Sequence, residues 1–139
     1  MKMSELTVRP KPPDNDVSRP YWKAAANGQL LIQKCGSCSA LRHYPRLICD
    51  QCYSNATEWV VASGRGSIHS WTIVHHAFHP AFKDELPYTL VTVDLDEGPR
   101  AIGRWLGDKL TIRDRVIGHF NLDNDTPILF FKPVLSLKD

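Results

Sequence analysis

The chain has 139 residues, and its 17 basic and 15 acidic side chains give a formal net charge of +2. This balanced charge argues against duplex DNA as a partner, because DNA-binding proteins gather many basic side chains against the phosphates. No apolar run approaches the roughly 20 residues of a membrane-spanning helix, and the first residues lack the apolar segment of a signal peptide. We therefore expect a soluble cytoplasmic protein with no membrane partner.

The N-terminal part of the chain is predicted to contain a flexible leader and one helix. Residues 1–15 form the leader, because three prolines near its end disfavour regular structure. Residues 16–29 hold the helix, whose turns are expected from about Val17 to Asn27. Asp16 or Ser18 is the candidate N-cap.

The part of the chain from residue 63 to residue 139 is predicted to form strands only. Apolar residues alternate with polar ones, which is typical of a strand with one buried face. Five short strands without an intervening helix favour a small closed barrel, because closure removes exposed sheet edges. The expected strands are Ser67 to His76, Tyr88 to Leu95, Ala101 to Leu106, Arg115 to Asn121 and Ile128 to Pro133, with Asp123, Asn124 and Asp125 joining the last two.

Between helix and barrel, residues 30–62 contain four cysteines in two close pairs. Cys35, Cys38, Cys49 and Cys52 form a C-x2-C, x10, C-x2-C array. Each pair fits a tight turn, and two such turns can offer four sulfur atoms tetrahedrally to one ion. In a reducing compartment, paired cysteines of this spacing indicate metal ligands rather than disulfides. We expect one structural zinc ion, with iron as the alternative that sulfur ligands do not exclude.

A cluster of histidines is the other group with possible chemistry. His69, His75, His76 and His79 flank Trp71, so a second metal site or an acid–base pair has to be considered. Neighbouring residues on a strand face opposite sides, however, and no carboxylate partner is fixed by spacing. We favour packing and hydrogen bonding for these histidines. The chain also lacks a G-x-S-x-G elbow, a glycine-rich phosphate loop and an H-E-x-x-H motif, so no catalytic residue is predicted.

An ordered set of short motifs runs from residue 16 to residue 133. Besides the cysteine pairs, it comprises Tyr21-Trp22, Gly28-Gln29-Leu30, Pro45-Arg46, Ser63-Gly64-Arg65-Gly66, Ile68 to Thr72, His79 to Phe82 and Val93 to Arg100. Together these motifs resemble the family called domain of unknown function 35. The resemblance implies a mainly β fold with an N-terminal helix, a rubredoxin-like zinc ribbon and a five-stranded OB-fold barrel. One segment departs from the family, which often has Gly-x-Pro-Val where this chain has Arg113 to Val116.

The resemblance also implies a function. Members of the family are non-catalytic partners of thiolase-superfamily enzymes such as thiolases, acyltransferases and aldolases, where they complete the acyl-CoA and pantetheine tunnel. The alternative partner is a hotdog-fold enoyl-CoA hydratase. The candidates for contact with acyl-CoA or with the partner are Trp71, Phe78, Phe82, Arg65, Arg100 and Arg104.

Two other classes of function are alternatives. OB-folds and zinc ribbons bind single-stranded nucleic acid through stacked aromatic rings and a basic groove. Here the charge is nearly neutral and the aromatic residues are not interleaved with dense lysine or arginine. A self-sufficient hydrolase would need a base and a nucleophile in contact, and the sequence shows no such pair.

Overall fold

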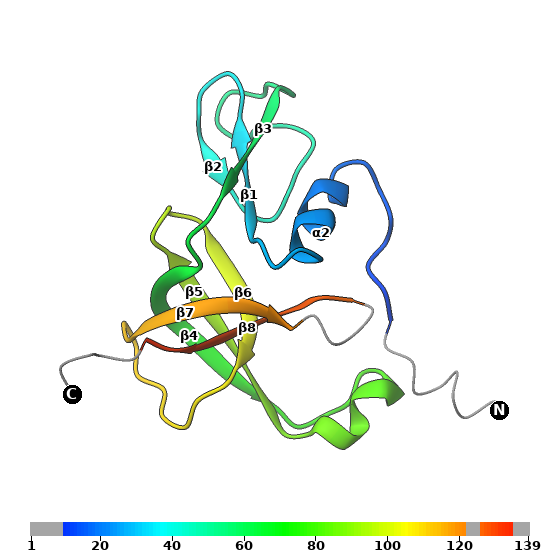
Figure 1. The fold of residues 1–139 in the computed structure, drawn as a ribbon, viewed down its shortest axis with the longest axis vertical. Coiled ribbons are helices and arrows are strands. Elements are labelled where there is room, and N and C mark those ends of the chain that lie inside the picture. The colour runs from blue at the N-terminus through cyan, green and yellow to red at the C-terminus, as the bar shows by residue number, and fades with distance from the viewer. Residues whose placement is uncertain (1–9, 122–125, 135–139) are drawn as a thin grey trace.

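The computed structural model describes residues 10–121 and 126–134. A short helix is followed by a three-stranded sheet and then by a closed five-stranded barrel, as Figure 1 shows. The predicted mainly β fold is therefore confirmed. The first nine residues of the expected leader and the Asp123–Asp125 connection lie outside the described residues.

The N-terminal helix, α2 (Arg19–Ala25), is two residues shorter at each end than predicted. Ser18 occupies the N-cap position, but its side chain makes no capping bond. Instead, the Asn15 Oδ1 atom accepts hydrogen bonds from the Ser18 N–H at 2.9 Å and the Ser18 hydroxyl at 3.0 Å. At the other end, Gly28 adopts φ 80°, a left-handed conformation that suits glycine and ends the helix.

The three-stranded sheet carries the cysteines. It consists of β1 (Leu31–Cys35), β2 (Leu41–Arg42) and β3 (Thr57–Val61), all antiparallel, in the order β2-β1-β3. The strands β1 and β3 lie on either side of the two cysteine pairs. The two-residue strand β2 was not predicted, because it is too short to show alternation.

The barrel strands follow the predicted order. They are β4 (Arg65–Val74), β5 (Tyr88–Leu95), β6 (Arg100–Trp105), β7 (Arg115–Asn121) and β8 (Ile128–Pro133), and they close in the order β4-β5-β6-β8-β7. The predicted limits of β5, β7 and β8 are correct, and those of β4 and β6 are displaced by one or two residues. A short 3-10 helix, η1 (Pro80–Glu85), lies in the β4–β5 connection and was not predicted.

One hydrophobic core joins the three parts of the chain. Val91, Val93 and Phe131 are fully buried in the barrel, and the same cluster includes Tyr21 from the helix and Ile32 from β1. Burial of apolar surface is the main favourable term in folding. The helix and the base of the ribbon are thus held on the barrel by a shared core.

The segment that departs from the family pattern keeps the bend that a glycine would favour. Arg113 adopts φ 75°, and its N–H donates to the Ile68 carbonyl at 2.8 Å. A non-glycine residue in this left-handed region carries a conformational cost. The bend is therefore held by its hydrogen bond to β4 rather than by glycine.

Candidate functional site

Four thiol groups meet at the tip of the three-stranded sheet. The Sγ atoms of Cys35, Cys38, Cys49 and Cys52 all lie within 4.8 Å of one another. The Cys35–Cys52 and Cys38–Cys49 sulfur pairs are 3.5 and 3.7 Å apart. In a tetrahedral site with zinc–sulfur bonds of about 2.3 Å, the sulfur atoms lie about 3.8 Å apart. The thiol positions therefore fit a four-coordinate metal ion.

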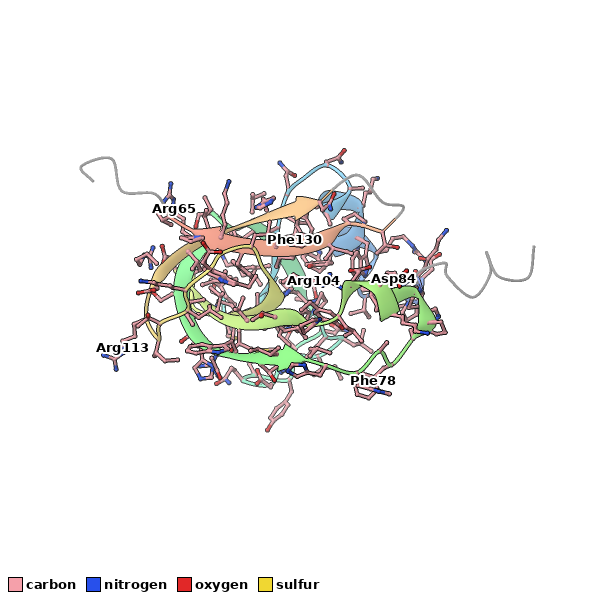
Figure 2. All side chains as sticks on the ribbon, turned by 90° about the horizontal axis from the view of Figure 1, so that it is seen from below. Arg65, Phe78, Asp84, Arg104, Arg113 and Phe130 are labelled. Atoms are coloured by element: carbon pink, nitrogen blue, oxygen red, sulfur yellow. The ribbon has the colours of Figure 1, made fainter. Side chains whose placement is uncertain are left out.

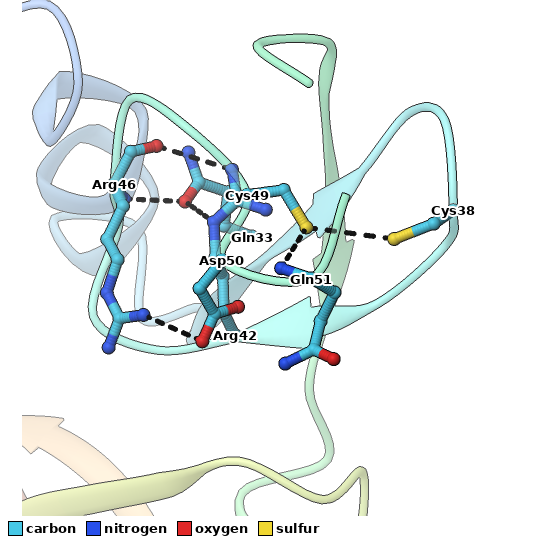
Figure 3. Close-up of polar contacts among 7 residues, drawn as sticks. All are labelled: Gln33, Cys38, Arg42, Arg46, Cys49, Asp50 and Gln51. Carbon is cyan, nitrogen blue, oxygen red and sulfur yellow. Dashed lines mark hydrogen bonds and ion pairs between the residues drawn. The ribbon is translucent and has the colours of Figure 1, made fainter. Parts of the chain in front are cut away.

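Backbone N–H groups favour the thiolate form of two of these cysteines, Cys35 and Cys49. The N–H groups of Cys38 and Ser37 donate to Cys35 Sγ at 3.4 and 3.3 Å, and these bonds lower the pKa of Cys35 to about 6. The Gln51 N–H donates to Cys49 Sγ at 3.3 Å and lowers the pKa of Cys49 in the same way (Figure 3). Cysteine binds a metal as thiolate, so the turns prepare the site for an ion.

A buried amide orders the loop that leads to the second cysteine pair. Gln33 is 2% exposed, and its Oε1 atom accepts from Arg42 Nε and from the Arg46 N–H, both at 2.6 Å (Figure 3). The Arg42 guanidinium also donates to the Arg46 carbonyl at 3.3 Å. The Gln33 Oε1 atom thus ties β2 to the loop that follows it, while Arg42 Nη1 is buried without a partner among the described residues.

A cleft of about 630 Å³ lies where the helix, the ribbon and the barrel meet. Its volume is within the range of small-molecule sites, and such sites are mostly apolar with a few polar groups. The walls are mainly aromatic and aliphatic side chains, among them Tyr21, Trp22, Tyr44, Phe82, Ile102 and Leu129. The sequence places Tyr21 and Trp22 in a motif of the family, and it does not single out Tyr44 or Ile102.

The position of the cleft follows from the barrel. In OB-folds the second and third strands, with the loop that precedes the second strand, form the usual ligand-binding face. Here these elements are β5, β6 and the connection that contains η1, and the helix and the loop after β2 cover them. The Tyr44 hydroxyl accepts from the Ile102 N–H at 2.9 Å, which fixes the ribbon loop to β6. The ribbon thus forms one wall of the cleft.

Arg104 is the one charged side chain among the described residues that line the cleft. Its Nη1 atom pairs with Glu85 Oε1 at 2.5 Å, and its guanidinium lies 3.9 Å from the centre of the Tyr88 ring. The positive charge is therefore already balanced. A groove for single-stranded nucleic acid needs several free cations along the backbone, so this cleft does not have the character of such a groove.

The six residues predicted to contact acyl-CoA or a partner do not lie together. Phe82 and Arg104 line the cleft. Arg100 pairs with Asp94 at 2.6 Å on the barrel surface, and Trp71 is 38% exposed on β4. The other two are Arg65 and Phe78, which Figure 2 shows at opposite ends of the barrel.

Three histidines of the cluster make hydrogen bonds or ring contacts within the chain. His69 Nδ1 lies 3.0 Å from Thr92 Oγ1, and His79 Nδ1 accepts from the Ala81 N–H at 3.1 Å, which caps η1. His76 packs edge-on against Phe78. Among residues 10–121 and 126–134, the cysteines are the one group of three or more donors placed to share an ion. These contacts agree with the interpretation of packing and hydrogen bonding.

Known families account for both halves of the chain. Residues 22–58 match the rubredoxin-like zinc ribbon domain of ChsH2, and residues 59–121 match its C-terminal OB-fold domain. The chain belongs to the ChsH2-type DUF35 family. In the residues that the structure describes, no helix is long and apolar enough to cross a membrane.

Individual members of the family are similar over most of this chain. A probable enoyl-CoA hydratase alpha subunit of Thermomonospora curvata is 34% identical over 136 residues, which are 95% of this chain and 42% of that protein. A DUF35 domain-containing scaffold protein of Methanothermobacter thermautotrophicus is 32% identical over 91 residues, which are 63% of this chain and 68% of that protein. This chain thus spans less than half of the hydratase subunit.

One solved structure matches this chain over the whole length of the solved chain. A chain of the Ltp2-ChsH2(DUF35) aldolase superimposes with a TM-score of 0.80 at 32% identity, and the match covers 90% of this chain and 100% of that chain. The fold of this chain is therefore shared with a chain of the Ltp2-ChsH2(DUF35) aldolase.

We expect the Cys49→Ala variant to lose the bound metal and the order of the ribbon. One of the four sulfur donors is removed, and a small metal-bound unit depends on its ion for folding. Metal analysis of freshly purified protein and amide exchange of β1 and β3 would measure both effects. Ser37→Ala, on the first cysteine turn, is the control and should keep the metal. Slow exchange in metal-free Cys49→Ala would contradict the role given to the ion.

We expect Tyr44→Phe to weaken the attachment of the ribbon to the barrel. The variant leaves the Ile102 N–H without its acceptor, at a cost of about 0.5–1.5 kcal/mol of the free energy of unfolding. Urea unfolding measures this cost. Tyr53→Phe removes a hydroxyl from a residue that is 80% exposed and should be neutral. Equal stability of the two variants would show that the Tyr44 bond contributes nothing.

Proposed function

We propose that the chain is a non-catalytic accessory subunit of an enzyme complex that acts on CoA thioesters. Its partner is a thiolase-superfamily protein, that is, a thiolase, acyltransferase or aldolase. The observation that carries the proposal is the match to the whole DUF35 chain of the Ltp2-ChsH2(DUF35) aldolase, at a TM-score of 0.80 and 32% identity. The scaffold protein of Methanothermobacter thermautotrophicus supports the same role.

The chemistry of the cleft supports a role without catalysis. Its described lining offers aliphatic and aromatic side chains, and its one cation, Arg104, is engaged with Glu85. Burial raises the pKa of Tyr21 and of Tyr44, so both phenols stay protonated at neutral pH and are not bases. The cysteines are gathered in the ribbon, away from the cleft lining. The reacting groups are thus assigned to the partner.

The cleft is proposed to complete the tunnel for the acyl and pantetheine groups. An apolar cleft of this size suits a hydrocarbon chain or ring, because burial of apolar surface drives binding. Phe82 and Arg104 lie in its wall, and Arg104 is paired with Glu85. Trp71, Phe78, Arg65 and Arg100 lie outside this cleft and are proposed to contact CoA or the partner at the surface.

The ion of the ribbon is proposed to be one structural zinc. Four sulfur donors close a tetrahedral shell and leave no position for a substrate or water. Thiolate ligands persist in a reducing compartment, and we place the protein in the cytoplasm on that ground.

A hydratase is the second candidate for the partner. The similarity to the alpha subunit of a probable enoyl-CoA hydratase favours it, since that subunit carries a matching region of 136 residues. In this case a hotdog-fold enoyl-CoA hydratase would hold the catalytic residues. The role of the present chain as an accessory would be the same.

Co-expression with the proteins encoded beside this chain tests the proposal. We expect a stable complex with a thiolase-superfamily protein and turnover of acyl-CoA by the complex, but no turnover by this chain alone. Mass analysis of the purified complex identifies the partner. A complex with a hydratase instead would favour the second candidate, and turnover by the isolated chain would overturn the accessory role.

A charge placed in the cleft tests the tunnel separately. Ile102 lies in the wall of the cleft and is 49% exposed in the free chain. Ile102→Glu places a carboxylate there, and we expect kcat/KM of the complex for a long-chain acyl-CoA to fall about tenfold or more, because a bound acyl group would bury an unpaired charge. Val61→Glu, at an exposed apolar position on β3, is the matched control. Unchanged kinetics of an intact Ile102→Glu complex would exclude the cleft from the acyl path.

A further inference from the structure

A proline-rich segment before the helix lies against the apolar cleft. Pro10 and Pro12 are among the residues that line the cleft. Pro12 is half-buried, whereas Lys11, between the two prolines, is exposed and is not part of the lining. In Figure 1 the blue trace before α2 runs from the helix toward the start of β8, where Ile128 also lines the cleft. Residues 10–12, which we call the proline strap, therefore form one wall of the cleft.

Proline is suited to such a wall because its ring is apolar and it has no backbone N–H. A backbone N–H that is buried without an acceptor costs free energy. Of the four residues from Pro10 to Pro13, only Lys11 has a backbone N–H. A proline also restricts the residue before it to an extended conformation. The segment can thus lie on the aromatic side chains of the cleft, as proline-rich ligands do in aromatic grooves.

Few polar contacts attach the proline strap to the rest of the chain. No hydrogen bond joins residues 10–13 to another described residue. The first polar attachment is at Asp14, whose Oδ1 atom accepts from Arg19 Nε at 2.9 Å, and both side chains are exposed. Exposed ion pairs contribute little to stability. The proline strap is therefore held on the cleft mainly by its two rings and can be displaced at low cost.

The proline strap borders the space that the proposed function assigns to the acyl group. Phe82 and Ile102 lie in other walls of the same cleft, which has a volume of about 630 Å³ with the strap in place. The size of an apolar site limits which groups it can bury. The barrel supplies walls that are fixed by strand pairing, whereas the strap supplies one that is not.

We propose that Pro10 and Pro12 determine the length of the acyl group that the cleft accepts. The two rings close the cleft over an acyl group that fits it, and a longer group is accommodated only when the proline strap is displaced. Displacement loses the apolar contacts of both rings, so longer acyl groups bind less tightly. This inference rests on the proposed function, which supplies the acyl group.

Binding of a neutral naphthylamine dye to the isolated chain tests the strap without a partner. Such a dye fluoresces when it is bound in an apolar site. The Pro10→Gly/Pro12→Gly variant lacks both rings and has a freer backbone. It should bind the dye about fivefold more tightly or better, because the apolar surface beneath the strap becomes accessible. Adding Ile102→Glu should abolish this gain, since it places a charge in the same cleft.

Pro13→Gly is the matched control for the dye measurement. Pro13 follows the proline strap, is exposed and does not line the cleft. Its substitution adds backbone freedom without removing a ring from the wall, so the dye affinity should stay at the wild-type level. Three results would each contradict the role of the two rings: an equal gain in Pro13→Gly, a gain that persists with Ile102→Glu, or wild-type affinity in Pro10→Gly/Pro12→Gly.

Kinetics of the co-purified complex test the effect on selectivity. Pro10→Gly/Pro12→Gly should raise kcat/KM for a longer acyl-CoA, relative to the preferred one, about fivefold or more, because the freed space buries additional CH2 groups. The change should lie in KM with kcat unchanged, since the rings act on binding rather than on the reacting atoms. An unchanged ratio would overturn the inference and leave the accessory role standing. No complex at all would overturn both, whereas wild-type dye affinity would overturn the inference alone.

Discussion

The convergence of four thiol groups on one point is the constraint on which the other features depend. Their Sγ atoms lie within 4.8 Å of one another, and thiolates this close need a cation between them. A ribbon of this size buries too little surface to fold without such an ion. Once ordered, the ribbon carries the loop with Tyr44, whose hydroxyl bonds to Ile102 on the barrel. An ion bound by the four cysteines therefore supports the cleft indirectly, because it orders the ribbon that forms one wall.

The docking of the helix and the ribbon on the barrel changes the surface on which an OB-fold usually binds its ligand. The face that binds nucleic acid in other OB-folds is here covered by α2 and by the ribbon, and its remaining space is apolar. The cation in it, Arg104, is balanced by Glu85 and stacked on Tyr88. The described lining of the cleft offers no base or nucleophile, which is consistent with a subunit that shapes a binding site. Under the proposed function, the catalytic groups belong to a second protein.

The sequence predicts the parts that depend on local pattern. Alternation located β5, β7 and β8, and the spacing of the cysteines located the thiol site. The cleft could not be predicted, because Tyr44 and Ile102 are 58 positions apart and meet only when the ribbon docks on the barrel. Arg113 also carries no sequence signal of its left-handed conformation, since glycine or asparagine usually marks such a bend.

The most direct test is a structure of the co-purified complex with an unreactive thioether analogue of an acyl-CoA. We expect the acyl group to lie between Tyr44, Phe82 and Ile102, with the carbon that replaces the reacting carbonyl beside side chains of the partner. An acyl group enclosed wholly by the partner would contradict the account. So would a side chain of this chain at the reacting carbon, since the cleft would then belong to a catalytic subunit.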